Sequence, residues 1–395
     1  MSKVGKFFKK HKGTILNLLG SLGLLVLAGG IGVFVALYQT YSPKKYMEDY
    51  YECFINESYA ALYKSANVEE SAFISLESFN QMMVNNYGYE DEDKYSISDV
   101  SRLGPYAQSM VSFKDSQTGE NVEWKLKLEK DEEKKYLFFN DWIVNIDDFI
   151  IEKVKLTAHK EVDIIIDDKN LTQEEIKGVK KTVDEETGIV TYLIDRMFAG
   201  DHTIMFVGTH TQPESFIVTF DENSKFYAFR DGDLKTDIQE SISTSVTNII
   251  VGMYNAVFEQ SGTETLATMF ANKEGVGHNL EATYISMVAA ANQENGATLE
   301  SIDINYYSMK FDRYDYDGTI DVKFNYTAGF EAKEPRVIEG GVVIDGVRQS
   351  YIGEVDAEAT VTFEYIDGKW QAVAIDMQCI DYGEEHKIEV EEEEQ

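Results

Sequence analysis

An uncharged apolar segment near the start of the chain constrains its architecture more than any other feature. It runs from Thr14 to Tyr38 as TILNLLGSLGLLVLAGGIGVFVALY. A helix rises about 1.5 Å per residue, so this segment can cross a hydrocarbon core of about 30 Å. The alternative is a secretory signal peptide cleaved after Ala28. Because the apolar run continues well past Ala28, we predict an uncleaved transmembrane helix over residues 14–38.

The charges that flank this segment predict its orientation. Residues 1–13, MSKVGKFFKKHKG, carry lysines and no acidic side chain. Lysine-rich flanks stay in the cytoplasm under the positive-inside rule. We therefore predict a single-pass protein of the cell membrane, with a cytoplasmic basic segment over residues 1–13 and everything after Tyr38 outside.

The charge balance of the whole chain is strongly acidic, with 36 Lys and Arg residues against 70 Asp and Glu residues and a formal net charge of −34. Such a surface repels phosphates, so we predict no nucleic-acid partner. It keeps a protein soluble, or it attracts cations and basic partners. The two cysteines, Cys53 and Cys379, are too few for a disulfide framework or a zinc ribbon, and we expect both to be free, buried thiols.

Two parts of the chain share a pattern in which helices precede strands. Over residues 42–152, SPKKYMEDYYECFINESYAALYKSA and SLESFNQMMVNNYG predict helices, the second capped by Ser75. YAQSMVSFKD and VEWKLKLEKD then alternate as a hairpin, and YLFFNDWIVNIDDF closes the sheet. Over residues 232–382, long helical stretches again precede strands that are joined by turns at Asp317-Gly318 and Asp367-Gly368.

Short β runs split by turn residues fill residues 153–231 and predict a small β-sandwich domain. Within it, TQEEIKGVKKTVDEETG reads as a charged loop or a helical turn. Trp142 and Trp370 each lie in the final strand of a flanking unit, and we interpret both as core residues that pack a sheet against its helices. Residues 383–395 form an acidic tail that we expect to be disordered. The predicted fold class is α+β.

Helices followed by a strongly bent sheet that ends in DGKWQAVAID resemble the NTF2-like cone fold. The order of anchor, NTF2-like domain, small β domain with MFAGDHTIMFV and second NTF2-like domain is similar to the TcaA-like extracytoplasmic proteins of Gram-positive bacteria. It is also similar to the non-catalytic N-terminal region of some penicillin-binding proteins. The resemblance covers about Lys44 to Asp381 and implies NTF2-like domains at 42–152 and 232–382. TcaA-like proteins often carry a cytoplasmic zinc ribbon, which the cysteine-free residues 1–13 lack.

Signatures of catalysis are missing from the sequence. No G-x-S-x-G or K-T-G is present, and the histidines show no H-E-x-x-H spacing. DRYDYDG departs from a calcium loop at Arg313 and predicts a hairpin turn. We therefore predict no cofactor, no metal and no enzyme, but a binding or scaffold protein that engages a cell-wall component or another envelope protein.

Two rival hypotheses stay open. The first is an enzyme that uses an NTF2-like cavity with a Tyr/Asp acid–base pair. The residues considered for that pair are Tyr50, Tyr63, Asp303 and Tyr306. The second is a structural spacer that holds a site away from the membrane.

The densest basic cluster outside the membrane lies on the strands before Trp142. Strand alternation puts two of its lysines on the solvent face, opposite Leu126 and Leu128. This is an ordinary solvated strand face, guarded by lysines, or a binding site for an anionic cell-wall polymer. The five residues of this candidate site are Lys125, Lys127, Lys130, Lys134 and Lys135.

Overall fold

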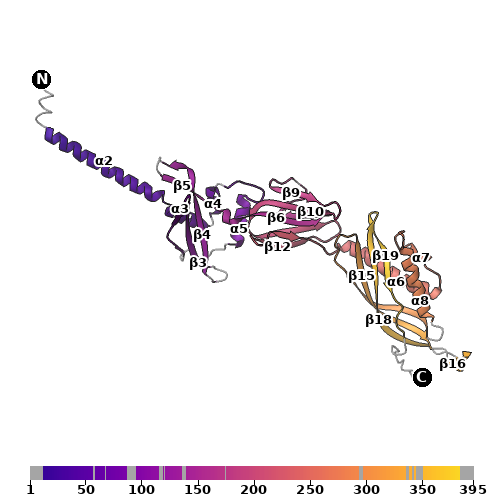
Figure 1. Cartoon of the computed structure of the whole chain (residues 1–395). Helices are drawn as coiled ribbons and strands as arrows, with labels where there is room; N and C mark the ends of the chain where they lie inside the picture. The colour runs from indigo at the N-terminus through magenta and orange to yellow at the C-terminus, as the bar shows by residue number, and fades with distance from the viewer. Residues whose placement is uncertain are drawn as a thin grey trace.

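The computed structural model describes residues 12–56, 58–66, 68–86, 95–114, 119, 121–135, 139–173, 175–292, 297–334, 338–339, 342–343 and 350–382. Its parts follow one another in an extended line, with an N-terminal helix and then three folded units (Figure 1). The predicted tail over residues 383–395 and most of the predicted cytoplasmic segment over residues 1–13 lie outside the described residues.

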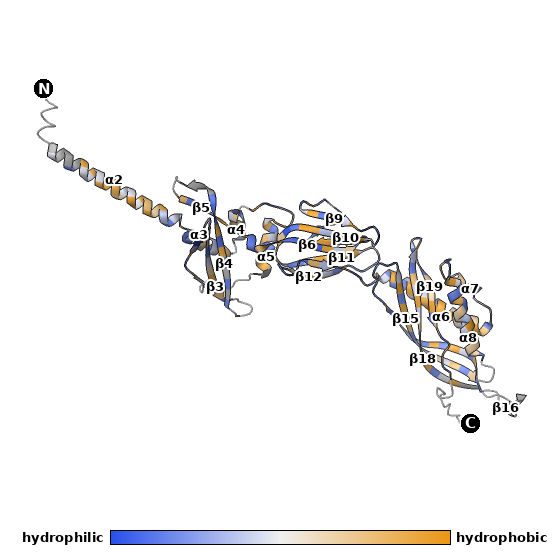
Figure 2. Ribbon diagram, viewed as in Figure 1, coloured by the Kyte–Doolittle hydropathy of each residue, from blue (hydrophilic) through white to orange (hydrophobic). Residues whose placement is uncertain are grey.

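The N-terminal helix is α2 (Lys12–Thr40), which is predominantly apolar (Figure 2). Its part Leu19–Thr40 is long and apolar enough to cross a membrane, and none of that part is buried inside the protein. Leucines such as Leu24 and Leu25 remain largely exposed, which is costly in water and favourable in lipid. The predicted helix is confirmed as one candidate membrane span, by length and composition.

The first folded unit places three helices before an antiparallel sheet. The sheet has the order β1-β3-β4-β5, with β2 also paired to β3. The predicted hairpin is confirmed, because β3 and β4 pair from Tyr106↔Glu129 to Lys114↔Asn121. The elements are α3 (Pro43–Ile55), α4 (Tyr59–Ala66), α5 (Leu76–Asn86), β1 (Ser96–Ile97), β2 (Ser101–Leu103), β3 (Tyr106–Lys114), β4 (Asn121–Lys135) and β5 (Phe139–Val144).

Local signals explain these helices. Ser42 caps α3, since its hydroxyl accepts from the Lys45 N–H at 3.3 Å. The predicted cap of α5 is also confirmed, because the Ser75 hydroxyl accepts from the Ser78 N–H at 3.1 Å. The long first helix of the sequence analysis is instead two helices. Its buried stripe is Met47, Tyr50, Tyr51 and Phe54, whereas Tyr46 and Cys53 are half-buried.

The middle unit is all β, as predicted, and is built from two four-stranded sheets of order β13-β6-β10-β9 and β12-β11-β7-β8. A short 3₁₀ turn, η1 (Asp147–Phe149), leads into it. Its strands are β6 (Ile150–His159), β7 (Val162–Ile166), β8 (Lys169–Asn170), β9 (Val179–Val183), β10 (Ile189–Phe198), β11 (Gly200–Gly208), β12 (Glu214–Phe220) and β13 (Phe226–Ala228).

One expectation for this unit is wrong. TQEEIKGVKKTVDEETG is not only a loop or helical turn, because it contains β9, which pairs with β10 from Val190↔Val183 to Ile194↔Val179. Gly178 and Gly188, on either side of this strand, both have positive φ and let the chain turn. The charged residues that suggested a loop are typical of an edge strand, where they prevent unwanted pairing with other strands.

The C-terminal unit repeats the order of helices before strands. Its sheet has the order β14-β15-β18-β19, and its long helix carries a buried apolar stripe that includes Ile242, Val246 and Ile249. The elements are α6 (Thr236–Glu259), α7 (Glu264–Ala267), α8 (Val276–Ala291), β14 (Thr298–Phe311), β15 (Thr319–Lys333), β18 (Ser350–Ile366) and β19 (Lys369–Met377), with a small hairpin of β16 (Ile338–Glu339) and β17 (Val342–Val343). The architecture is therefore α+β, with curled antiparallel sheets.

The hydrophobic cores do not stop at the unit boundaries. Phe198 of the sandwich belongs to the first unit's core, where its ring centroid lies 5.4 Å from that of Phe79. A second core continues from the sandwich into the C-terminal unit. Glu152 pairs with Arg196 inside the sandwich, and Gly232 exchanges backbone hydrogen bonds of 3.0 and 2.9 Å with Tyr314. The unit boundaries thus lie in paired backbone rather than in open linkers.

Candidate binding site and the joint that positions it

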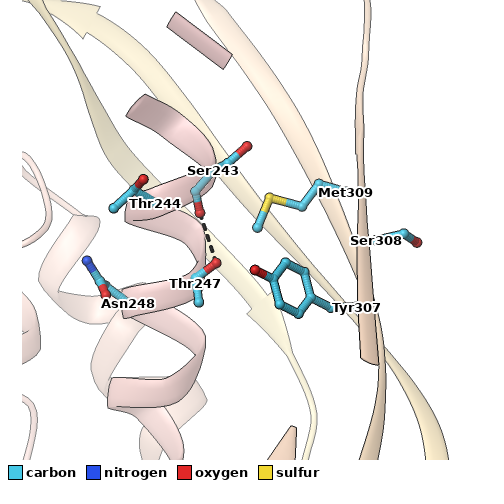
Figure 3. A pocket seen from close by; sticks show the side chains of 7 residues that line it. All are labelled: Ser243, Thr244, Thr247, Asn248, Tyr307, Ser308 and Met309. Carbon is cyan, nitrogen blue, oxygen red and sulfur yellow. Dashed lines mark hydrogen bonds between the residues drawn. The ribbon is translucent and has the colours of Figure 1, made fainter. Parts of the chain in front are cut away.

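A hollow of about 460 Å³ opens between α6 and β14 of the C-terminal unit, and we call it the helix-side hollow. Tyr307 and Met309 point from β14 toward the helix, whereas Ser308 points away to the other side of the strand (Figure 3). Helix α6 contributes hydroxyl and amide groups that lie beside its row of buried apolar residues. The lining residues are Ser243, Thr244, Thr247, Asn248, Tyr307, Ser308 and Met309.

A second hollow, of about 660 Å³, lies on the outer face of the same sheet, and we call it the outer hollow. Its lining residues lie side by side on neighbouring strands. Tyr306 lies opposite Thr327 on β15, and Thr327 lies opposite Asp356 on β18. The Thr327 hydroxyl donates to Asp356 Oδ1 at 2.6 Å. Its lining residues are Tyr306, Tyr307, Ser308, Asn325, Tyr326, Thr327, Asp356, Ala357 and Glu358.

Two exposed tyrosines line these hollows, Tyr306 the outer one and Tyr307 both. Tyr306 is 75% exposed and Tyr307 is 57% exposed, although Tyr307 stacks on Phe324 with a centroid distance of 5.2 Å. Exposed tyrosines beside hydroxyl and amide groups supply contact area at a small loss of conformational entropy, with adaptable hydrogen bonding around them. This arrangement can bind a partner.

The residues considered for an acid–base pair do not converge. Tyr50 and Tyr63 are buried in the first unit, where their hydroxyls donate to the Trp142 and Ile74 carbonyls at 2.9 and 3.2 Å. Asp303 and Tyr306 lie exposed on β14 of another unit. Within the described residues, no group of three His, Cys, Asp or Glu side chains could hold a metal ion. Cys53 and Cys379 are free thiols, as predicted, but both are half-buried rather than buried, and burial raises the pKa of Cys379 to about 11.

The predicted lysine site is divided between two environments. Lys125 is exposed on the solvent face, opposite the buried Leu126 and Leu128, as the alternation predicts. The Lys127 ammonium lies 4.8 Å from the Tyr106 ring centroid.

The other three lysines lie elsewhere. The Lys130 ammonium lies 5.9 Å from the ring of the buried Trp142. Lys134 and Lys135 follow a register shift in the β4–β5 pairing, and their side chains lie outside the described residues. The described lysines therefore do not form one basic patch.

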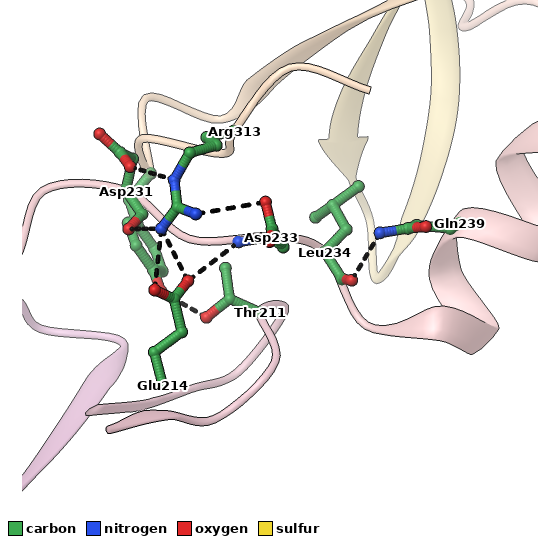
Figure 4. A network of polar contacts seen from close by, with 8 residues as sticks. Thr211, Glu214, Asp231, Asp233, Leu234, Gln239 and Arg313 are labelled. Carbon is green, nitrogen blue, oxygen red and sulfur yellow. Dashed lines mark hydrogen bonds and ion pairs between the residues drawn. The ribbon is translucent and has the colours of Figure 1, made fainter. Parts of the chain in front are cut away.

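A joint between the sandwich and the C-terminal unit fixes where the two hollows face. At its polar end, Arg313 bonds to carboxylates from the sandwich side (Figure 4). Its Nη2 donates to Glu214 Oε1 at 2.7 Å, its Nε donates to Asp231 Oδ1 at 2.5 Å, and its Nη1 donates to Asp233 Oδ1 at 3.3 Å. The segment predicted as a simple hairpin turn is thus also a docking element.

The apolar end of this joint corrects the expectation for one tryptophan. Trp142 is a core residue at 4% exposure, as predicted, but Trp370 is only half-buried. Its ring packs edge-on against His210 of the sandwich, with a centroid distance of 5.6 Å. His210 also lies 4.2 Å from the Tyr365 ring. Trp370 therefore holds two units together in addition to flanking its own core.

Two histidines lie in this joint and have lowered pKa values. Burial lowers the pKa of His210 and of His159, which stacks on Tyr316 at 5.3 Å. The charged groups that face them are Glu161, which opposes the lowering at both, Lys235 beside His210 and Lys160 beside His159.

A buried histidine with a lowered pKa stabilises the fold above its unfolded-state pKa of about 6.5, and this stability is lost as pH falls through the lowered pKa. We therefore expect the melting temperature of the full chain to fall between pH 6.5 and pH 5. A His159→Gln/His210→Gln variant should show a shallower fall over the same range, measured by circular dichroism. An unchanged slope in the variant would contradict the assignment.

Sequence reasoning missed both hollows and the joint. Tyr306 was considered only for an acid–base pair, and Arg313 only as a departure from a calcium loop. The available signals were adjacent tyrosines in a strand and a lone arginine among aspartates, and neither identifies a partner without the fold. No protein-family model matches the chain, and no curated protein matches its sequence.

Proposed function

We propose that this chain is a single-pass extracytoplasmic protein of a bacterial cell envelope, of TcaA-like type with two NTF2-like domains, that binds a cell-wall component or another envelope protein. The hollows on either side of β14 are the proposed binding site. The observation that carries the proposal is their position in the last folded unit of a chain that begins with an apolar helix (Figure 1).

The continuity of the cores supports a presenting role. A binding site on a flexible string of domains loses orientation, whereas packed and hydrogen-bonded joints preserve it. The second core spans the sandwich and the C-terminal unit, and Arg313 closes their polar side. The folded units thus act as a stalk that holds the hollows away from the membrane surface.

Charge favours the hollows over the lysines as the binding site. Glu123 and Glu129 flank Lys125 and Lys127 on the same face of β4, so an anionic polymer would meet carboxylates as well. The hollows instead combine two exposed tyrosines with hydroxyl, amide and carboxylate groups, a composition that suits specific recognition.

Binding to isolated cell envelopes tests the proposal. Full-length protein in nanodiscs should co-sediment with envelopes of a Gram-positive bacterium. A Tyr306→Ala/Tyr307→Ala variant should lose about a hundredfold in affinity, since each of the two exposed aromatic anchors contributes about 1–2 kcal/mol.

A Lys125→Glu/Lys127→Glu variant is the matched control and should bind as the wild type does. Loss of binding in the lysine variant alone would move the site to β4. Unchanged binding in both variants would contradict a binding site in the hollows and favour a structural spacer.

A further inference from the structure

The two edge strands of the C-terminal sheet differ in whether other segments hydrogen-bond to their outer backbone. At one edge, β19 is covered, since the Ala271 N–H donates to the Ala372 carbonyl at 2.8 Å and Asn279 Oδ1 accepts from the Ile375 N–H at 2.8 Å. At the other edge, β14 pairs with β15, and among the described residues its one further bridge joins Thr298, at the start of the strand, to Asn292. Within the described residues, nothing hydrogen-bonds to the outer backbone of β14 from Tyr306 to Met309.

The free stretch has defined ends. A register shift between Ile304 and Tyr306 interrupts the ladder before it, and Lys310 follows it. Bulges and lysines are the usual devices that stop an edge strand from pairing indiscriminately. Between the bulge and Lys310, the pairing of Tyr306–Met309 with β15 is regular, and this stretch contains no bulge or lysine that would prevent a further strand from pairing. The edge is therefore open over these four residues.

The two hollows lie on opposite faces of this same stretch and share Tyr307 and Ser308. Successive side chains of a β-strand point to opposite faces. A strand added beside β14 would therefore direct alternate side chains toward the helix-side hollow and the outer hollow. Peptides that add to a sheet edge use this mode, in which the backbone ladder gives affinity and alternate pockets give specificity.

We propose that the free edge of β14 binds an extended basic peptide segment of a partner protein, which joins the sheet as an additional strand. This inference rests on the proposed function and names the partner for that site. The outer face carries Asp303 on β14 itself and, two strands further in, Glu354, Asp356 and Glu358 at every second position of β18. Long basic side chains that reach across the outer hollow toward Asp356 and Glu358 thus belong on the outer side of the bound strand.

The helix-side hollow selects the other set of side chains. It offers hydroxyl groups from Ser243 and Thr247 with the side chain of Met309, which suits small or β-branched residues such as threonine and valine. A second copy of this chain fits the edge poorly, because its own acidic face and the net charge of −34 would repel. A glycan lacks the amide N–H groups in strand register that a backbone ladder needs.

A labelled peptide with alternating lysine and threonine, Lys-Thr-Lys-Thr-Lys-Thr-Lys, is the probe. Its binding to the full chain in zwitterionic nanodiscs is followed by fluorescence anisotropy. N-methylation of every second amide blocks one edge of the peptide and leaves the other free. We expect one N-methylated set to lose about tenfold in affinity, as for two lost backbone hydrogen bonds, and the complementary set to bind normally.

Matched charge variants locate the bound strand. Asp356→Asn/Glu358→Gln should weaken probe binding several-fold, whereas Asp376→Asn/Glu281→Gln removes the same net charge elsewhere on this unit and should leave binding intact. Asp376 and Glu281 are both exposed.

Several outcomes would overturn the proposal. These are the absence of probe binding, equal effects of the two N-methylated sets, equal binding of a scrambled peptide, or equal effects of the two charge variants. Self-association through β14 without probe binding would assign the edge to a second copy. Envelope binding that still depends on Tyr306 and Tyr307 in these cases would leave the proposed function standing without its peptide partner.

Discussion

Deletion of residues 1–40 is expected to move the protein almost completely from the membrane fraction to the soluble fraction. The deletion removes α2, whose apolar side chains are not buried by any other part of the described chain. Insertion of about twenty apolar residues as a spanning helix is effectively irreversible, whereas the remaining acidic surface is repelled by anionic lipids. Ultracentrifugation of cell lysates after an alkaline wash measures the change.

The control for this deletion is a shorter one that removes residues 1–11 and keeps α2. It should stay with the membranes. If the protein without residues 1–40 still sedimented after the alkaline wash, the anchor would lie elsewhere. Protease added to intact, wall-stripped cells tests the orientation, since it should degrade the part after Tyr38, and full protection of that part would overturn the proposed topology.

The Arg313→Glu substitution is expected to open the joint between the sandwich and the C-terminal unit. In the native joint one guanidinium bonds to Glu214, Asp231 and Asp233. The substitution removes these charge-assisted bonds and places a fourth carboxylate among the three. Glu214 is the most buried of the three, with 18% of its side chain exposed. It therefore contributes the largest share of the free energy that the substitution removes.

Arg313 itself is 44% exposed, so solvent screens each ion pair and the joint is weakened by about 2 kcal/mol rather than by the full cost of a buried pair. We expect faster proteolytic cleavage in the joint and a broader distance distribution in small-angle X-ray scattering. Raising the salt concentration should weaken the wild-type joint in the same direction.

Arg230→Glu is the matched control, because Arg230 is exposed and lies beside the same segment. It carries the same change of charge and should leave the cleavage rate unchanged. Equal cleavage of the two variants would mean that the aromatic contacts of Trp370 and His210 alone hold the joint.

The deletion of residues 1–40 and the Arg313→Glu substitution are both expected to leave binding to isolated envelopes intact. Without α2 the hollows keep their lining residues but lose their tether, so binding to isolated envelopes should persist. With the joint opened, the hollows remain intact within the C-terminal unit but lose their orientation. Binding in solution should therefore survive both changes, while presentation from a membrane should not.

Local pattern determined a large part of this fold. The uncharged run Thr14–Tyr38 dictates a helix that suits lipid, because unpaired backbone groups are not tolerated there. The stripe of α6 and the alternation of β3 and β4 follow from the periods of 3.6 and 2, which the sequence displays directly. Ser75 caps α5 for an equally local reason. Such features depend on neighbours a few residues apart.

Tertiary structure decided what lies between elements distant in sequence. Arg313 meets Glu214 across 99 positions, and Trp370 meets His210 of another unit. The same alternation that placed Trp370 in a strand could not tell whether its ring would face helices or a neighbouring unit. Among the described lysines, Lys130 lies near Trp142 on the opposite strand face from Lys125, and a register shift precedes Lys134 and Lys135. The edge of β14 is open from Tyr306 to Met309 because no described strand pairs with it on the side away from β15, and adjacency in space is not written in local periodicity.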